Sequence, residues 1–92
     1  MPRINIEQPH SLSAADAKVK LDQLGQDLSS KYGLAVSWPK DTEAKVERTG
    51  AKGIIRIDPA KILVDLDLSF VLSPMKGQIE DKIREELRKL FG

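Results

Sequence analysis

The stretch of sequence that decides the fold is KILVDLDLSFVLS, residues 61–73. Every second position in it is apolar, namely Ile62, Val64, Leu66, Leu68, Phe70 and Leu72. Because successive side chains of a strand point to opposite faces, these residues share one apolar face, while Asp65, Asp67 and Ser69 lie on the other. The pattern predicts a long antiparallel strand with one dry side, and that side needs a cover.

The expected cover is a C-terminal helix that begins at Ser73 and Pro74. Serine is a favoured N-cap, and proline loses no hydrogen bond at the first helical position. An apolar stripe then follows at helical spacing, and opposite charges stand four residues apart on the other face. The stripe consists of Met75, Ile79, Ile83, Leu87 and Leu90. We expect it to face the sheet, with packing on a lipid-like or polymer surface as the alternative.

The rest of the chain predicts one further helix and four shorter strands. Ser13 as N-cap and Gly33 as a left-handed C-terminal residue bracket a helix over residues 14–32. Alternation and turn residues predict strands at residues 3–7, 34–38, 43–49 and 54–58, with a hairpin loop at residues 50–53. Connections this short favour neighbouring antiparallel strands, so the last four strands should form a meander.

The expected architecture is a single α+β domain over residues 1–92, in the order β-α-β-β-β-β-α. Its terminal helix would lie across the dry face of the meander. This layout is similar to a shortened helix-grip fold, in which a curved antiparallel sheet wraps a long helix. The similarity concerns topology alone, and topology does not determine function.

The amino-acid composition argues against several classes of function. The net charge is +1, which argues against a strongly basic nucleic-acid surface. There is no cysteine and a single histidine, His10, which excludes disulfides, thiolate catalysis and two-histidine metal motifs. No apolar run is long enough for a membrane span, and the first ten residues lack a signal-peptide pattern. We expect a cytosolic protein with no cofactor, no nucleic-acid partner and no integral membrane segment.

Several residues have both a chemical and a structural interpretation. His10 is expected in a loop as a solvated or locally capping side chain, because a general-base role would need a partner that the sequence does not identify. Asp65 and Asp67 could act as paired carboxylates, but alternating Asp on a strand is more often the wet face of a half-buried sheet, and cross-strand ion pairs to Arg56 and Lys45 are sufficient reason for them. Trp38 is a candidate surface anchor, with core packing as the alternative.

The whole chain resembles the family of polyhydroxyalkanoic acid system proteins, which are small bacterial proteins linked to polyester storage granules. The segments that carry this resemblance are Ile4-Asn5-Ile6, Pro9-His10-Ser11-Leu12, Ala14-Ala15-Asp16-Ala17, Tyr32-Gly33, Trp38, Gly53-Ile54-Ile55, Leu72-Ser73-Pro74-Met75-Lys76 and Ile79-Glu80. The resemblance implies a bacterial cytosolic protein that is associated with storage granules. It implies no reaction and no catalytic residue.

Two functions from different classes follow, and an enzyme is the third and least supported. The first is a non-enzymatic accessory protein that binds the granule surface or a granule-associated protein. The second is a module that holds a small apolar, acyl-type ligand between sheet and terminal helix, unless the same side chains simply fill the core. Its candidate lining residues are Leu66, Leu68, Phe70, Ile79 and Ile83. An unpaired edge strand at residues 3–7 or 34–38 would also permit a homodimer.

Overall fold

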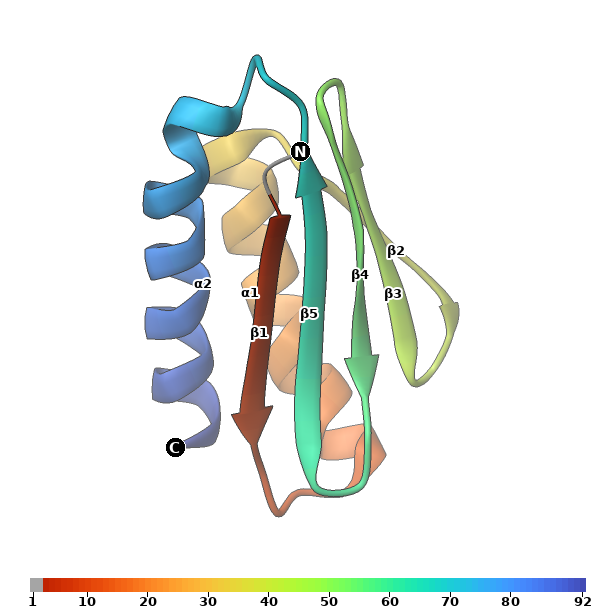
Figure 1. Cartoon of the computed structure of the whole chain (residues 1–92). Helices are drawn as coiled ribbons and strands as arrows, with labels where there is room; N and C mark the ends of the chain where they lie inside the picture. The colour runs from red at the N-terminus through yellow and green to blue at the C-terminus, as the bar shows by residue number, and fades with distance from the viewer. Residues whose placement is uncertain (1–2) are drawn as a thin grey trace.

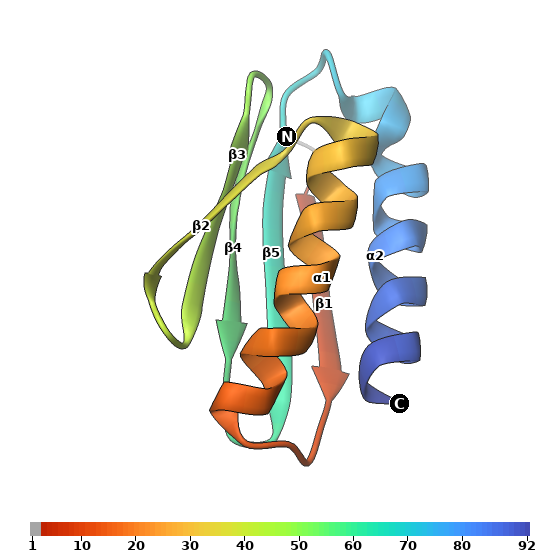
Figure 2. The ribbon, with the colours of Figure 1, turned by 180° about the vertical axis from the view of Figure 1, so that it is seen from behind.

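The computed structural model describes residues 3–92; Met1 and Pro2, which the expected domain includes, lie outside the described residues. Two helices pack side by side on one face of a five-stranded antiparallel sheet, and the other face is open (Figures 1 and 2). The α+β class and the predicted element order are therefore confirmed. The elements are β1 (Arg3–Pro9), α1 (Ala14–Tyr32), β2 (Ala35–Lys40), β3 (Glu43–Arg48), β4 (Ala51–Ile57), β5 (Lys61–Leu68), the 3-10 turn η1 (Ser73–Met75) and α2 (Lys76–Phe91).

The strands follow the spatial order β1-β5-β4-β3-β2. The predicted meander runs from β2 to β5, and β1 is added next to β5, with Ile4 opposite Leu66. The edge strands are β1 and β2, and β2 is interrupted by an irregularity between Ser37 and Lys40. Because α2 packs mainly against β1 while α1 covers β2 and β4, the terminal helix shares the dry face with α1. The sheet stays open and does not wrap the terminal helix.

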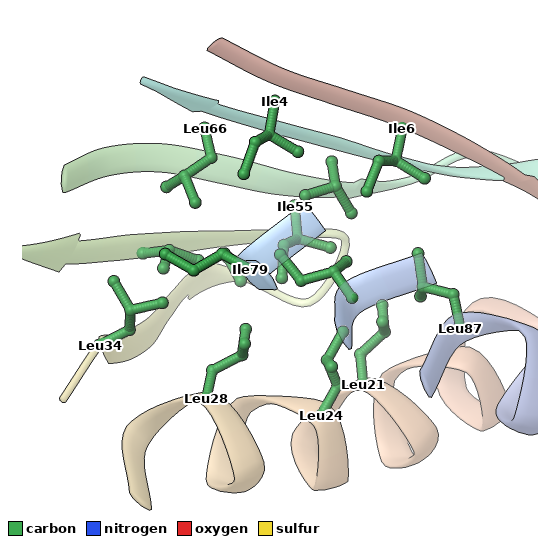
Figure 3. Close-up of a cluster of buried hydrophobic side chains, with 14 of the residues drawn as sticks. Ile4, Ile6, Leu21, Leu24, Leu28, Leu34, Ile55, Leu66, Ile79 and Leu87 are labelled. Carbon is green, nitrogen blue, oxygen red and sulfur yellow. The ribbon is translucent and has the colours of Figure 1, made fainter. Parts of the chain in front are cut away.

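The hydrophobic core lies between the sheet and the two helices (Figure 3). The sheet contributes the alternating side chains that the sequence pattern selects, and each helix contributes one apolar stripe. Ile79, Ile83 and Leu87 of α2 are at most 1% exposed, which confirms that the stripe of the terminal helix faces the sheet. The largest fully buried side chains are Ile4, Leu21, Leu24, Leu28, Leu34, Ile55, Ile62, Leu68, Ile79, Ile83 and Leu87.

Local signals set the ends of α1 where the sequence predicts them. The Ser13 hydroxyl accepts a hydrogen bond from the amide of Asp16 at 3.2 Å, as an N-cap does. Gly33 has φ 69° and donates its amide to the carbonyls at the end of the helix. On α2, the four predicted ion pairs between residues four apart all form, at 2.8–3.6 Å.

The predicted long strand is too long at its C-terminal end. β5 stops at Leu68, and the chain turns before Leu72 re-enters the core. Phe70, expected on the dry face, is instead 81% exposed. The turn also changes the start of the last helix, because η1 precedes α2 and Ser73 makes no side-chain capping bond.

The hairpin loop expected at residues 50–53 is shorter than predicted. Only Thr49 and Gly50 form the turn, and β4 begins at Ala51. Gly53 lies inside β4, paired with Val46 on one side and Leu66 on the other. A Cβ atom on Gly53 would lie 2.1 Å from the carbonyl oxygen of Asp65. Glycine is therefore needed at this position because two strands approach closely, and not because the chain reverses there.

Candidate functional site

The most unusual surface feature is a pair of adjacent apolar side chains at one end of the molecule. Phe70 and Val71 are 81% and 82% exposed, and they occupy the turn between β5 and η1. We call this pair the apolar tip. The turn that carries it lies next to the β3–β4 turn in both views of the ribbon (Figures 1 and 2). In the described part of the chain, only Val19 on α1 is a comparably exposed large apolar residue, and it stands alone.

Backbone hydrogen bonds hold the apolar tip in a defined shape. The amide of Leu72 donates to the carbonyl of Ser69 at 3.1 Å, and the amide of Ser73 donates to that of Phe70 at 3.3 Å. On the sheet side, the amide of Ser69 donates to the carbonyl of Gly50 at 2.8 Å. The tip is thus a closed turn that is bonded to the neighbouring hairpin, and its two side chains are presented without a flexible loop.

Gly50 makes this connection possible. Its φ of 88° lies in the left-handed region that favours glycine. A Cβ atom there would approach the Ser69 hydroxyl oxygen to 2.9 Å and the Leu72 side chain to 3.4 Å. Leu72 is only 5% exposed, so it anchors the turn from below. The Ser69 hydroxyl is buried and makes no hydrogen bond within the described residues.

Trp38, the surface anchor expected from the sequence, is less accessible than the apolar tip. It is half-buried on β2 and packs against the core. The ammonium group of Lys18 lies 5.4 Å from the centre of its ring, which is a cation–π distance. Trp38 therefore covers the β2 side of the core, and a lysine partly covers the ring itself.

The residues expected to line a ligand cavity divide into two groups. Leu66, Leu68, Ile79 and Ile83 are buried in the core, whereas Phe70 lies outside it on the apolar tip. The cavity that borders Leu66 and Ile83 has a volume of about 10 Å³. A single water molecule needs roughly 10–15 Å³. The space beside these residues is too small for an acyl chain.

The open face of the sheet carries acids and bases that neutralise one another across the strands. Glu47, Lys52, Asp67 and Arg3 form one transverse row from β3 to β1, with alternating charge. Arg3 also donates two hydrogen bonds of 2.7 Å to the carboxylate of Asp65. These hydrogen bonds hold the pKa of Asp65 below its usual value.

The partner of the strand carboxylates differs from the one expected. Arg3 contacts Asp65 and also lies 3.4 Å from the carboxylate of Asp67, whereas Arg56 pairs with Glu43 at 3.2 Å. The sequence predicted cross-strand pairing but chose the wrong basic residues, because it did not place β1 beside β5. Both acids are therefore part of a neutralised surface, which explains them without acid–base chemistry.

Both ring nitrogens of His10 are used in local structure. Nδ1 accepts from the amide of Leu12 at 3.1 Å, so the proton must sit on Nε2, which donates to the carbonyl of Asp58 at 2.7 Å. The ring also lies 5.8 Å from that of Phe91 near the end of α2. His10 thus has the capping role that was its structural interpretation, and it joins three segments of the chain.

An ionic group connects the two helices where α1 and α2 meet. Glu86 of α2 is 8% exposed and accepts from Lys82 at 2.8 Å. This hydrogen bond lowers the pKa of Glu86. The neighbouring ammonium of Lys82 lowers the pKa of Lys31 on α1. Charges of both signs are present, so the group offers no excess charge to a ligand.

The described residues contain no group of three or more His, Cys, Asp or Glu side chains that could hold a metal ion. Over the same part of the chain, neither helix combines the length and apolar character that crossing a membrane requires. The apolar tip is the group of exposed large apolar side chains that the described residues present to a partner. The sequence contained a signal for it, because Phe70 and Val71 are adjacent and a strand would have to expose one of them.

Fold and surface together define a small α+β domain with an open antiparallel sheet and a rigid apolar tip. The sequence model of the family described as "Putative polyhydroxyalkanoic acid system protein" matches residues 4–91. The chain belongs to this family, as the resemblance in its sequence implied. A comparison with curated proteins found no match.

Proposed function

We propose that the protein is a non-enzymatic accessory protein of bacterial polyhydroxyalkanoate storage-granule metabolism, and that it binds granules through the apolar tip. The observation that carries the proposal is the exposure of Phe70 and Val71 in a closed turn. Family membership supplies the metabolic system, and the tip supplies a means of attachment. The expected location is the cytoplasm, at the granule.

The tip suits attachment because its exposed apolar side chains lose contact with water when they bind an apolar surface, and this burial is favourable. Fully burying one large apolar side chain is worth about 1.5–3 kcal/mol, so two give a useful but reversible contribution. The polar residues considered for catalysis support the non-enzymatic assignment. Asp65 is neutralised by Arg3, and both ring nitrogens of His10 are bonded to backbone groups.

The alternative function, a binding module for an acyl-type ligand, has less support. It requires a cavity beside the buried residues Leu66 and Ile83, and about 10 Å³ is present there. A ligand would have to displace packed side chains, which costs stability. We therefore retain granule binding as the proposed function.

Co-sedimentation with isolated native granules tests the proposal. We expect the wild-type protein to sediment with granules and the double variant Phe70→Ser, Val71→Ser to stay in the supernatant. Val19→Ser is the matched control, because it removes an exposed apolar side chain from a different surface, and it should sediment like the wild type. If the wild-type protein stays in the supernatant while a granule coat protein sediments, the proposal fails.

A further inference from the structure

We infer that the apolar tip inserts into the polyester surface of the granule itself, and not into a groove of a coat protein. This inference rests on the proposed function, and it names the partner of the same site. Four properties of the tip support it: its small area, its convex shape, the absence of charged residues in the two turns at this end, and its rigidity.

The apolar area is too small for a specific protein interface. Phe70 and Val71 are 81% and 82% exposed. Together they offer on the order of 300 Å². A stable protein–protein interface buries roughly 800 Å² on each partner. A deformable apolar phase needs no such area, because it can surround each inserted side chain.

The shape of this end also argues against a matched protein partner. The turn that carries the tip projects beyond the end of the sheet (Figure 1), and both of its apolar side chains are exposed. The adjacent depression is open, and its charged lining residues are Glu47, Arg48, Lys52 and Asp67, two acids and two bases. Protein docking sites place their anchors within complementary surroundings. Here the apolar pair is flanked by an open depression with charges of both signs, and no apolar groove surrounds it.

The two turns at this end carry no charged residue. One turn consists of Thr49 and Gly50, and the segment from Ser69 to Met75 reads SFVLSPM. Two cations flank these turns along the chain, Arg48 before Thr49 and Lys76 after Met75. Arg48 donates to the carbonyls of Tyr32 and Thr49, and the ammonium of Lys76 lies 3.3 Å from the carboxylate of Glu80, so both already have partners within the chain. Segments that bind anionic phospholipids typically present free lysine and arginine at the contact. Binding to a neutral, ester-rich polymer does not require free lysine or arginine at the contact.

The turn that carries the tip is also rigid. The hydrogen bonds of Leu72, Ser73 and Ser69 already fix the turn, so insertion has little conformational entropy to remove. Insertion at one end of an elongated molecule of 36 × 24 × 22 Å would leave the sheet and helices outside the polymer. The charged open face then stays in water.

The test compares binding to protein-free amorphous polyhydroxybutyrate particles, native coated granules, and phosphatidylcholine vesicles with or without phosphatidylglycerol. We expect the wild-type protein and Val19→Ser to bind the bare particles. Phe70→Ser, Val71→Ser should bind about tenfold more weakly or worse. Circular dichroism on each variant verifies the fold, which exposed substitutions should leave intact.

A fluorescence measurement reports insertion directly. Phe70→Trp in a Trp38→Phe background should shift its emission to shorter wavelength on bare particles, because the indole enters an apolar phase. Val19→Trp in the same background is the control and should not shift. An unshifted Phe70→Trp spectrum for particle-bound protein would overturn the inference.

The remaining outcomes separate the inference from the proposed function. Binding to coated granules but not to bare particles would overturn insertion into polymer and leave granule binding standing, with a coat protein as partner. Equal or tighter binding to vesicles would identify phospholipid as the surface and overturn the inference. A dimer that the tip variant converts to monomer would show that a second copy covers the tip. No binding to any granule would remove both proposals.

Discussion

Arg3 of β1 donates two hydrogen bonds of 2.7 Å to the carboxylate of Asp65 on β5, one from Nε and one from Nη2. The two residues are 62 positions apart in the chain. This bidentate contact fastens the first strand to the sheet at its exposed edge.

The contact predicts a stability that falls in acid. The folded-state pKa of Asp65 is below its ordinary value of 3.8. The contribution of ionised Asp65 to stability is therefore complete above about pH 5 and is lost as the pH falls through the lowered pKa. Asp65→Asn should be less stable than the wild type at pH 7, and the difference should shrink below about pH 4. Thermal unfolding between pH 7 and pH 2 measures both effects.

Asp67→Asn is the matched control for this experiment, because Asp67 lies on the same face but 3.4 Å from Arg3. It should change the melting temperature less than Asp65→Asn does. An equal difference between wild type and Asp65→Asn at every pH would contradict the predicted linkage.

Gly53→Ala should be among the most damaging single-methyl changes in the chain. The new Cβ would lie 2.1 Å from the carbonyl oxygen of Asp65 and 2.7 Å from the Cα of Leu66, so β4 and β5 must separate. We expect a loss of about 3 kcal/mol in the free energy of unfolding. Gly77→Ala is the control, since nothing lies within 4 Å and α2 should gain about 0.5 kcal/mol. Urea denaturation measures the free energy of unfolding of both variants. A loss in Gly53→Ala that is no larger than the change in Gly77→Ala would contradict the prediction.

Ile83→Ala tests whether the interior is a packed core. Ile83 is 1% exposed, and truncating it should cost about 3 kcal/mol because the cavity cannot fully collapse. Wild-type protein should show no rise in melting temperature with octanoate or 3-hydroxyoctanoate, because the space at this position is about 10 Å³. A saturable rise that Ile83→Ala abolishes would restore the acyl-binding alternative.

The tautomer of His10 is also open to measurement. Nitrogen NMR of the imidazole at pH 8 should show a bare Nδ1 and a protonated Nε2, because Nδ1 accepts from Leu12 and Nε2 donates to Asp58. His10→Ala removes both bonds and should cost about 1–2 kcal/mol. The opposite tautomer in the spectrum would rule out the three-segment connection described above.

Local signals in the sequence predict both ends of the first helix, but no local signal marks the end of the long strand. Ser13 and Gly33 act on their own neighbours, so sequence alone locates both ends of α1. The apolar alternation continues through Phe70 and Leu72 although the chain has already turned. Leu72 is buried because the turn returns it to the core, so its match to the strand alternation is a coincidence. The candidate site lies in this misread segment.

Glycine positions show a second limit of sequence reasoning. Gly50 and Gly53 both suggested a loop, but only Gly50 has a positive φ. Gly53 is required by the backbone of β5, which is adjacent in space but more than ten positions away in the sequence. The same non-local pairing brings Arg3 to Asp65, which is why the cross-strand acids were predicted and their partner was not.

The position of β1 has a consequence for the order of folding. The strands from β2 to β5 are joined by short turns, so that their pairing closes small loops, which is fast. β1 is the first strand of the sheet to emerge during synthesis, yet its only neighbour, β5, is the last strand to be made. The docking of β1 must wait until β5 has been made, and β1 has no strand partner until then. Nascent chains that stop before β5 should therefore remain open to chaperones and proteases.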